Sequence, residues 1–210
     1  MKSFPEFLAE AAQYGAVNLA FEGGMYSLVN ELERLAAVFR QAGISYEIVG
    51  GVAVNAHILE AQRSRSFLTR DIDVLMLQED LPALVSFAAA VGYEAKKIMG
   101  GHALILPGQH LEEAVHILFT GKKPRSTYPV ANPALSPEEK EIYGVSVPVA
   151  PLRDLLTMKL NSLRDKDKVQ LQILDEVGLI TDAVLSDVPE ILQTRLQELR
   201  TSWQAEDLEL

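Results

Sequence analysis

Hydrophobic positions follow helical and strand spacings in turn along the first 120 residues. Between Met25 and Gln41 the apolar residues recur at helical spacing and Gly43 follows, which predicts a helix that ends there. Helices are also predicted at 52–59 and 81–91. Short apolar runs bounded by glycine and polar residues predict strands at 46–49, 71–77, 93–98, 103–106 and 114–119. This alternation is typical of an α/β protein.

The pattern changes after residue 120. Five prolines lie between Gly121 and Pro151, which predicts a long irregular connector with a short strand at 145–147. Helices are predicted after it, at 152–163, 169–177 and 188–199. We therefore predict an α/β (α+β) fold, a mixed sheet flanked by helices with a C-terminal helical region packed on it. The predicted parts are an N-terminal helical segment, 1–44, an α/β core, 45–150, and the helical region, 151–210, in one compact unit.

Composition narrows the function classes. The 210 residues carry a formal net charge of −10, which argues against a protein that coats nucleic acid. Half of this negative excess lies in residues 181–210, whereas residues 122–180 are net positive. The net charge is therefore compatible with one basic site on an otherwise acidic protein. There is no cysteine, which excludes disulfides, thiolate metal sites and cysteine nucleophiles. No segment is long and apolar enough to cross a membrane, and we expect a cytoplasmic protein.

The strongest chemical signal is a pair of carboxylates in a predicted strand. Alternate residues of a strand share a face, so Asp71 and Asp73 project side by side, about 7 Å apart. Such carboxylates repel each other unless a cation lies between them, and Mg²⁺ or Mn²⁺ takes carboxylate oxygens together with substrate phosphates. Upstream, Gly50 and Gly51 open a predicted helix, whose free backbone N–H groups favour a phosphate.

Each of these signals also has an ordinary structural interpretation. An Asp-apolar-Asp triplet is commonly a solvated strand face, and a Gly-Gly pair after a strand is usually a turn. Lys166 is interpreted in the same way as part of a solvated helix surface. Lys159 differs, because it interrupts an apolar run and so points to a polar cleft. The conjunction of Gly50-Gly51 with the Asp pair in one strand-helix-strand unit favours a site for a metal-bound nucleoside triphosphate.

These segments resemble the signature of the DNA polymerase β-type nucleotidyltransferase superfamily, and more closely its AbiEii/AbiGii toxin-type members. The first matching stretch comprises residues 48–51, 53–54, 57 and 69–74. The second is the basic motif at 158–167, with Lys159, Arg164, Lys166 and Asp167. The resemblance covers residues 46–178 and implies a nucleotidyltransferase-like sheet. It is more specific for the superfamily than for any substrate.

The resemblance implies roles for individual residues. Asp71 and Asp73 would hold the metal, and Gly50 and Gly51 would cradle the β- and γ-phosphates. Lys159 would neutralise developing phosphate charge, acting as a catalytic and nucleotide-binding residue. The remaining basic-motif residues, Arg164, Lys166 and Asp167, are expected to bind the nucleotide. The implied partners are a nucleoside triphosphate, an RNA (in toxin-type relatives tRNA) or protein hydroxyl as acceptor, and a restraining antitoxin.

The sequence departs from the family pattern at two acidic positions. His116 stands where a third carboxylate is expected, and Gln170 stands where a second Asp often follows in the basic motif. In the family the third carboxylate acts on the attacking hydroxyl, so we count His116 among the catalytic candidates. A neutral His can be a metal ligand or a general base, and it can equally mark a site that has lost its chemistry.

Three functions follow from these alternatives. The first is a metal-dependent nucleotidyltransferase that modifies an RNA or protein hydroxyl, as a toxin in a toxin–antitoxin pair would. The second is a catalytically degenerate nucleotide-binding or regulatory protein of the same fold. In this case His116 and Gln170 have replaced the usual acidic residues and catalysis has been lost. The third is a structural partner in a complex, which would use the acidic C-terminal tail.

Overall fold

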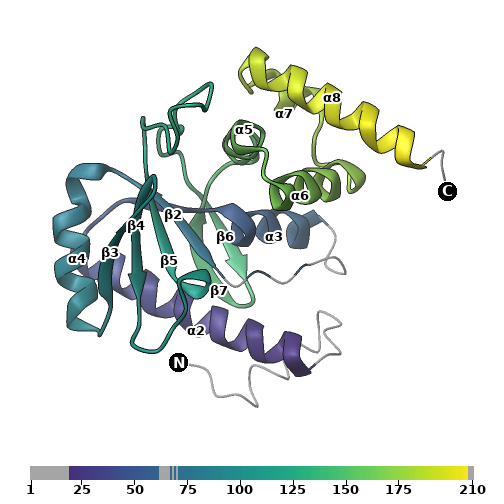
Figure 1. The fold of residues 1–210 in the computed structure, drawn as a ribbon. Coiled ribbons are helices and arrows are strands. Elements are labelled where there is room, and N and C mark those ends of the chain that lie inside the picture. The colour runs from purple at the N-terminus through teal and green to yellow at the C-terminus, as the bar shows by residue number, and fades with distance from the viewer. Residues whose placement is uncertain (1–18, 62–66, 68, 70, 208–210) are drawn as a thin grey trace.

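The computed structural model describes residues 19–61, 67, 69 and 71–207 (Figure 1). Within these residues a mixed sheet of seven strands forms the centre, in the order β3-β4-β5-β2-β1-β7-β6. The strands are β1 (Tyr46–Val49), β2 (Ile72–Met76), β3 (Glu94–Ile98), β4 (Gly101–Ile105), β5 (Val115–Phe119), β6 (Glu138–Ile142) and β7 (Val145–Val149). The mixed sheet flanked by helices confirms the predicted fold class.

The register of the central strands brings distant positions into one row. Strand β2 runs antiparallel to β1 and parallel to β5, so Asp73 pairs with Val49 on one side and with His116 on the other. Residues opposite each other in neighbouring strands project from the same face of a sheet. The sheet therefore places the predicted acidic residue Asp73 and His116 next to each other, although they lie 43 positions apart along the chain.

Helices cover both faces of the sheet. On one face α2 (Leu19–Ala42) packs across the strands beside α4 (Leu81–Ala90), and the rings of Phe39 and Tyr46 stack at 3.9 Å. The α5 helix (Leu152–Ser162) lies on the opposite side of the sheet in Figure 1 and contributes Leu155 to the core. Val49 and Asp73 project toward this second face, which is where a site can form.

The helices on this side share a second hydrophobic core. They are α3 (Gly50–Ala61), α5, α6 (Asp165–Glu176), α7 (Asp182–Ser186) and α8 (Glu190–Asp207). Val54 and Ile58 of α3 pack with Leu156 and Leu160 of α5 and with Leu171 of α6. The helix that begins at Gly50 is thus fixed against the helices that carry the basic motif. Among the described residues, no helix is long and apolar enough to cross a membrane.

The largest difference from the sequence prediction lies between residues 121 and 151. This stretch is not an irregular connector throughout, because 138–142 and 145–149 form the β6–β7 hairpin. Among the described strands β6 pairs only with β7, and it is mostly exposed, so its charged sequence gives no apolar signal. The helices predicted at 169–177 and 188–199 are longer than expected, and two short 3₁₀ helices occur at 78–80 and 111–113. Residues 1–18 of the predicted N-terminal segment lie outside the described residues.

Glu47 is a fully buried carboxyl on β1, and it makes stability depend on pH. Its Oε2 accepts the Ser136 N–H at 3.0 Å, whereas its Oε1 has no partner among the described residues. Burial raises the pKa of Glu47 to about 7, and the nearby Asp154 charge acts in the same direction. Because the folded-state pKa exceeds the unfolded one, this contribution to stability is complete below about pH 4.5 and is lost as the pH rises through 7.

We therefore predict that Glu47→Gln flattens the pH dependence of unfolding. Between pH 5 and pH 8 the wild type loses roughly 2–3 kcal/mol more of its unfolding free energy than the variant, since one pKa unit corresponds to about 1.4 kcal/mol. Urea titrations at both pH values measure this difference, and Glu198→Gln, at an exposed position, is the matched control. A Glu47→Gln curve parallel to that of the wild type would contradict the prediction.

Candidate active site

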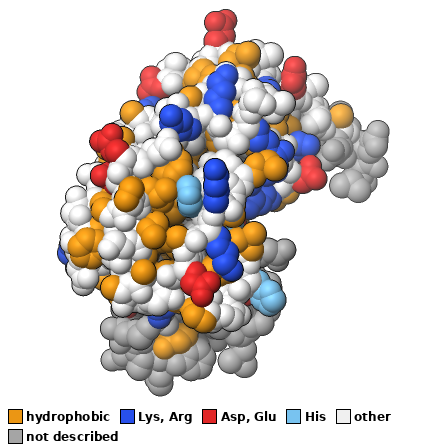
Figure 2. Space-filling view, turned by 60° about the vertical axis from the view of Figure 1, so that its left-hand side comes forward, with side chains coloured by type: hydrophobic (Ala, Val, Ile, Leu, Met, Phe, Trp, Pro, Cys, Tyr) orange, Lys and Arg blue, Asp and Glu red, His pale blue; other side chains and the backbone are white. Residues whose placement is uncertain are grey.

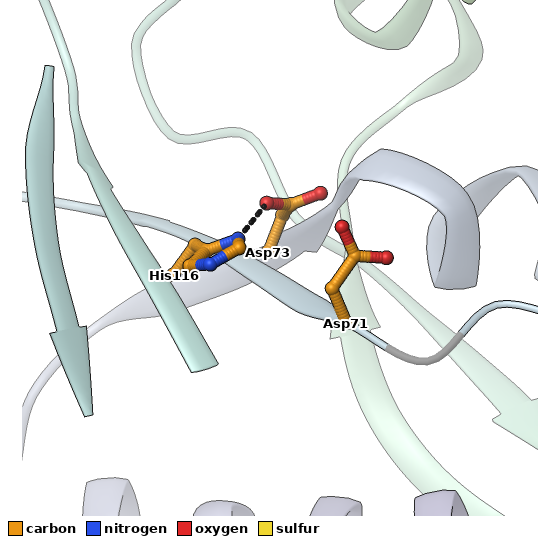
Figure 3. A group of neighbouring side chains, drawn as sticks. All are labelled: Asp71, Asp73 and His116. Carbon is orange, nitrogen blue, oxygen red and sulfur yellow. Dashed lines mark hydrogen bonds and ion pairs between the residues drawn. The ribbon is translucent and has the colours of Figure 1, made fainter. Parts of the chain in front are cut away.

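Asp71, Asp73 and His116 form a compact group at the edge of the second face. Figure 3 shows both carboxylates on the same side of β2, with the His116 ring directed at Asp73. The His116 Nδ1 lies 3.3 Å from Asp73 Oδ1, and one potential ligand atom from each residue lies within 4.8 Å of the others. Asp71 lies outside β2, one residue before its start. The two carboxylates nevertheless project side by side, as predicted. Two carboxylates and one imidazole fit a divalent metal ion.

His116 is held at both ring nitrogens. Its Nε2 lies 3.2 Å from the carbonyl oxygen of Leu111, in the short 3₁₀ helix before β5. The hydrogen bond with Asp73 raises the pKa of His116 above its ordinary value, although burial acts in the opposite direction. The contact with Leu111 was not foreseen from the sequence, because a backbone carbonyl has no residue signature.

The Gly-Gly pair allows the Asp73 carboxylate to approach the start of α3. Gly50 has φ +68°, and a Cβ added there would lie 2.0 Å from Asp73 Oδ2. A Cβ on Gly51 would lie 2.7 Å from Thr69 Oγ1. Only glycine combines this left-handed backbone with such close contacts. The pair therefore places the free N–H groups of a helix N-terminus beside the carboxylates, as the sequence predicts.

Asp71 is oriented by two hydrogen bonds. Thr69 Oγ1 donates to Asp71 Oδ1 at 2.9 Å, and the Lys166 ammonium donates to Oδ2 at 2.9 Å. Burial raises the pKa of Asp71, but the hydrogen bonds from Lys166 and Thr69 and the Lys166 charge outweigh it and hold the pKa below its usual value. Lys166 thus reaches the carboxylate pair instead of only lining a solvated helix surface.

Lys159 is a buried cation whose nearest carboxylate, Asp167, is shared with Arg164. Its side chain is 5% exposed, its Nζ donates to the side-chain oxygen of Gln170, and Asp167 Oδ1 lies 3.6 Å away. Burial lowers the pKa of Lys159, and the charge of Asp167 opposes this. Gln170, in the place of the family's second Asp, holds the ammonium without neutralising it. The predicted position of Lys159 in a polar cleft agrees with the cavities that it lines.

Asp167 and Arg164 form the N-terminal cap of α6. Asp167 is 1% exposed and accepts hydrogen bonds from the Arg164 backbone N–H at 3.2 Å, from Arg164 Nε at 2.7 Å and from Ser162 Oγ at 2.6 Å. Half of the Arg164 side chain is exposed. The Asp167 carboxylate therefore positions Arg164 at the cavity wall, and a direct contact of Asp167 with nucleotide stays a prediction.

Two adjoining cavities meet at Asp73. The Lys166 cavity, of about 390 Å³, is lined by Gly50, Gly51, Phe67, Thr69, Asp71, Asp73, Lys159, Arg164, Lys166, Asp167, Val169, Gln170 and Ile173. The His116 cavity, of about 240 Å³, shares Gly50, Asp73, Lys159, Arg164 and Asp167 with it. The remaining wall of the His116 cavity is mainly apolar and includes Leu118, Tyr128 and Met158. Every site residue predicted from the sequence lines one or both of these cavities.

Comparison with known proteins supports the fold at low sequence identity. No family model matches the chain, and no curated protein matches its sequence. The structure resembles the antibiotic-resistance factor ANT(2'')-Ia, with 14% identity, TM-score 0.50 and coverage of 88% of this chain and 95% of that chain. It also resembles the lincomycin-bound lincosamide antibiotic adenylyltransferase LnuA, with 15% identity, TM-score 0.52 and coverage of 71% and 97%.

A third similar structure is an antigenic nucleotidyltransferase-like protein from Paracoccidioides brasiliensis, with 18% identity, TM-score 0.52 and coverage of 82% of this chain and 87% of that chain. The chain therefore has a nucleotidyltransferase-like fold, as its motifs predict. The finer resemblance, to the toxin-type nucleotidyltransferases, stays a prediction.

Proposed function

We propose that this protein is a metal-dependent nucleotidyltransferase. The observation that carries the proposal is the Asp73 carboxylate at the junction of two cavities, with Asp71 and three cationic side chains in one and His116 in the other. In the proposed reaction an acceptor hydroxyl oxygen bonds to the α-phosphorus of a nucleoside triphosphate. The bond between the α-phosphorus and the bridging oxygen breaks, pyrophosphate leaves, and the hydroxyl proton passes to water.

The Lys166 cavity has the properties of a triphosphate site. Lys159, Arg164 and Lys166 supply positive charge, and the N-terminus of α3 adds free N–H groups at Gly50 and Gly51. Of these three cations Lys159 is buried, and a buried cation stabilises charge that develops on phosphate oxygens more strongly than an exposed one does. Asp71 and Asp73 would hold Mg²⁺ or Mn²⁺, and the ion would supply Lewis-acid stabilisation of the phosphate charge.

The His116 cavity is the proposed acceptor side. It reaches Asp73 without including Asp71, and its apolar wall with Tyr128 can pack against a ring, such as the base of a terminal nucleoside. Lys122, Lys123 and Arg125 are exposed in the chain segment beside it. Figure 2 shows a face on which Lys and Arg side chains gather beside hydrophobic ones. Local positive charge favours an RNA acceptor despite the acidic total.

The finer parts of the proposal rest on the resemblance. They are an RNA hydroxyl (tRNA among the candidates) or a protein hydroxyl as acceptor, a cytoplasmic location, and a toxin role with an antitoxin partner. One structural neighbour is a lincosamide antibiotic adenylyltransferase, so a small hydroxyl compound belongs in the same test.

The test is transfer of label from α-³²P-labelled nucleoside triphosphates. Purified protein is incubated with each triphosphate, a divalent metal, and total RNA, total protein or lincomycin in separate reactions. We expect label on one acceptor class, with no label for Asp71→Ala. If no acceptor is labelled, and Asp71→Ala behaves like the wild type, the enzyme proposal is wrong. Nucleotide binding without transfer would instead support the degenerate-site alternative, and neither binding nor transfer would support a structural partner.

A further inference from the structure

His116 presents a lone pair in a fixed direction when its ring is neutral. A carbonyl oxygen can only accept a hydrogen bond, so the 3.2 Å contact with Leu111 O requires the proton on Nε2. With Nε2 protonated, Nδ1 is the nitrogen at which a metal ion would replace the proton that His116 shares with Asp73 Oδ1 at 3.3 Å. Metal-binding histidines commonly donate their second ring N–H to a carbonyl or carboxylate, which fixes the tautomer and the ring orientation.

Three electron-pair donors then converge on one point. One ring nitrogen of His116 and one oxygen each of Asp71 and Asp73 lie within 4.8 Å of one another, and Nδ1 is the nitrogen that approaches Asp73. Lys166 pairs with Asp71 Oδ2, and a divalent cation between the three residues would offset the remaining repulsion between the two carboxylates. Adjacent ligands of one octahedral ion lie about 3 Å apart when the bonds are about 2.1 Å long. The spacing of Nδ1 and Oδ1 is close to that value.

We propose that His116 Nδ1 is a ligand of the divalent metal and makes this site prefer Mn²⁺ over Mg²⁺. Carboxylate oxygens serve both ions, whereas an imidazole nitrogen favours first-row transition metals over Mg²⁺. A third carboxylate in this position would add an oxygen ligand and favour Mg²⁺. The inference rests on the proposed function for the identity of the site, but its test requires no transfer.

The rival role for His116 is that of a general base. A base must keep the Nδ1 lone pair free for the acceptor proton, so the same nitrogen cannot serve as a ligand at that moment. A base therefore predicts no metal–nitrogen bond and no effect of His116 on the choice of metal. Metal binding alone separates the two roles.

The experiment measures Mn²⁺ binding by electron paramagnetic resonance in the nucleotide-free protein at pH 8. Loss of the free Mn²⁺ signal gives the dissociation constant, competition with Mg²⁺ gives the Mg²⁺-to-Mn²⁺ ratio, and electron spin echo modulation detects a coordinated ¹⁴N nucleus. We expect nitrogen coupling in the wild type and its loss in His116→Asp. In that variant the ratio of the Mg²⁺ to the Mn²⁺ dissociation constant should fall by about tenfold or more. His110→Ala removes another, exposed histidine and should behave like the wild type.

Three results would overturn the inference: no Mn²⁺ binding up to about 1 mM, which is the weak end of protein metal affinities, bound Mn²⁺ without nitrogen coupling, or nitrogen coupling that persists in His116→Asp. An unchanged metal ratio in His116→Asp would also overturn the claimed preference. Failure of the proposed function gives a different result. If the protein binds Mn²⁺ through His116 but transfers no nucleotide, the inference about the metal ligand holds and the proposed enzymatic function is wrong. If transfer with Mg²⁺ is equally fast in the wild type and in His116→Asp, the enzymatic function holds and the inferred metal preference is wrong.

Discussion

Replacement of Asp73 by Asn is expected to lower kcat/KM for nucleotidyl transfer by at least about a thousandfold, with little change in folding. Asn keeps the shape of the side chain but loses the negative charge. Among the described residues two acidic side chains, Asp73 and Asp167, line both cavities. Asp167 is paired with Arg164, whereas the ion-pair partner of Asp73 is His116. Under the proposed function, the site without this charge would lack one of its two carboxylate metal ligands at the junction of the two cavities.

The measurement compares transfer rates at saturating metal, together with circular dichroism to verify folding. Asp187→Asn makes the same chemical change at an exposed position after α7 and should retain full activity. Asp73→Asn with more than a tenth of the wild-type kcat/KM would remove Asp73 from the catalytic group. The fall should appear mainly in kcat, because the cations of the proposed triphosphate site, Lys159, Arg164 and Lys166, remain in place.

The local order of the site was predictable from the sequence. Alternation in a strand gives the common direction of Asp71 and Asp73, and a Gly-Gly pair at the end of a strand gives the helix N-terminus beside them. The neighbouring position of His116 required more than alternation, because it depends on the parallel register of β2 and β5. The resemblance supplied that pairing by placing His116 where the third carboxylate is expected.

Long-range contacts made by common groups were not predictable. The carbonyl oxygen of Leu111 has no sequence signature, and the ion pair between Lys166 and Asp71 joins residues 95 positions apart. An exposed lysine on a helix is ordinarily solvated, so only the packing of α3 against α6 reveals that Lys166 reaches the carboxylates. Strand β6 was not predicted for a different reason. Strands were predicted from apolar runs, and an exposed edge strand need not be apolar.

The second large effect is expected from Gly50→Ala, which should destabilise the fold and disrupt the site together. Gly50 has φ +68°, a conformation that costs a residue with a side chain about 1–2 kcal/mol. The added Cβ would also lie 2.0 Å from Asp73 Oδ2 and 2.8 Å from Asp73 Cγ, so the carboxylate or the start of α3 must move, which adds about 1–3 kcal/mol. The expected fall in Tm is roughly 6–15 °C for a chain of this size.

Gly43 provides a closely matched control for this substitution. It has φ +66°, but a Cβ there meets nothing within 4 Å, so Gly43→Ala should cost only the backbone term. The difference between the two variants in urea unfolding isolates the contact with Asp73. Asp73→Ala removes the two shortest contacts, and in the double variant it should recover about 1–2 kcal/mol of the loss caused by Gly50→Ala. Equal destabilisation by Gly50→Ala and Gly43→Ala would show that Asp73 does not press against the start of α3, and the proposed geometry of the metal and phosphate sites would have to be revised.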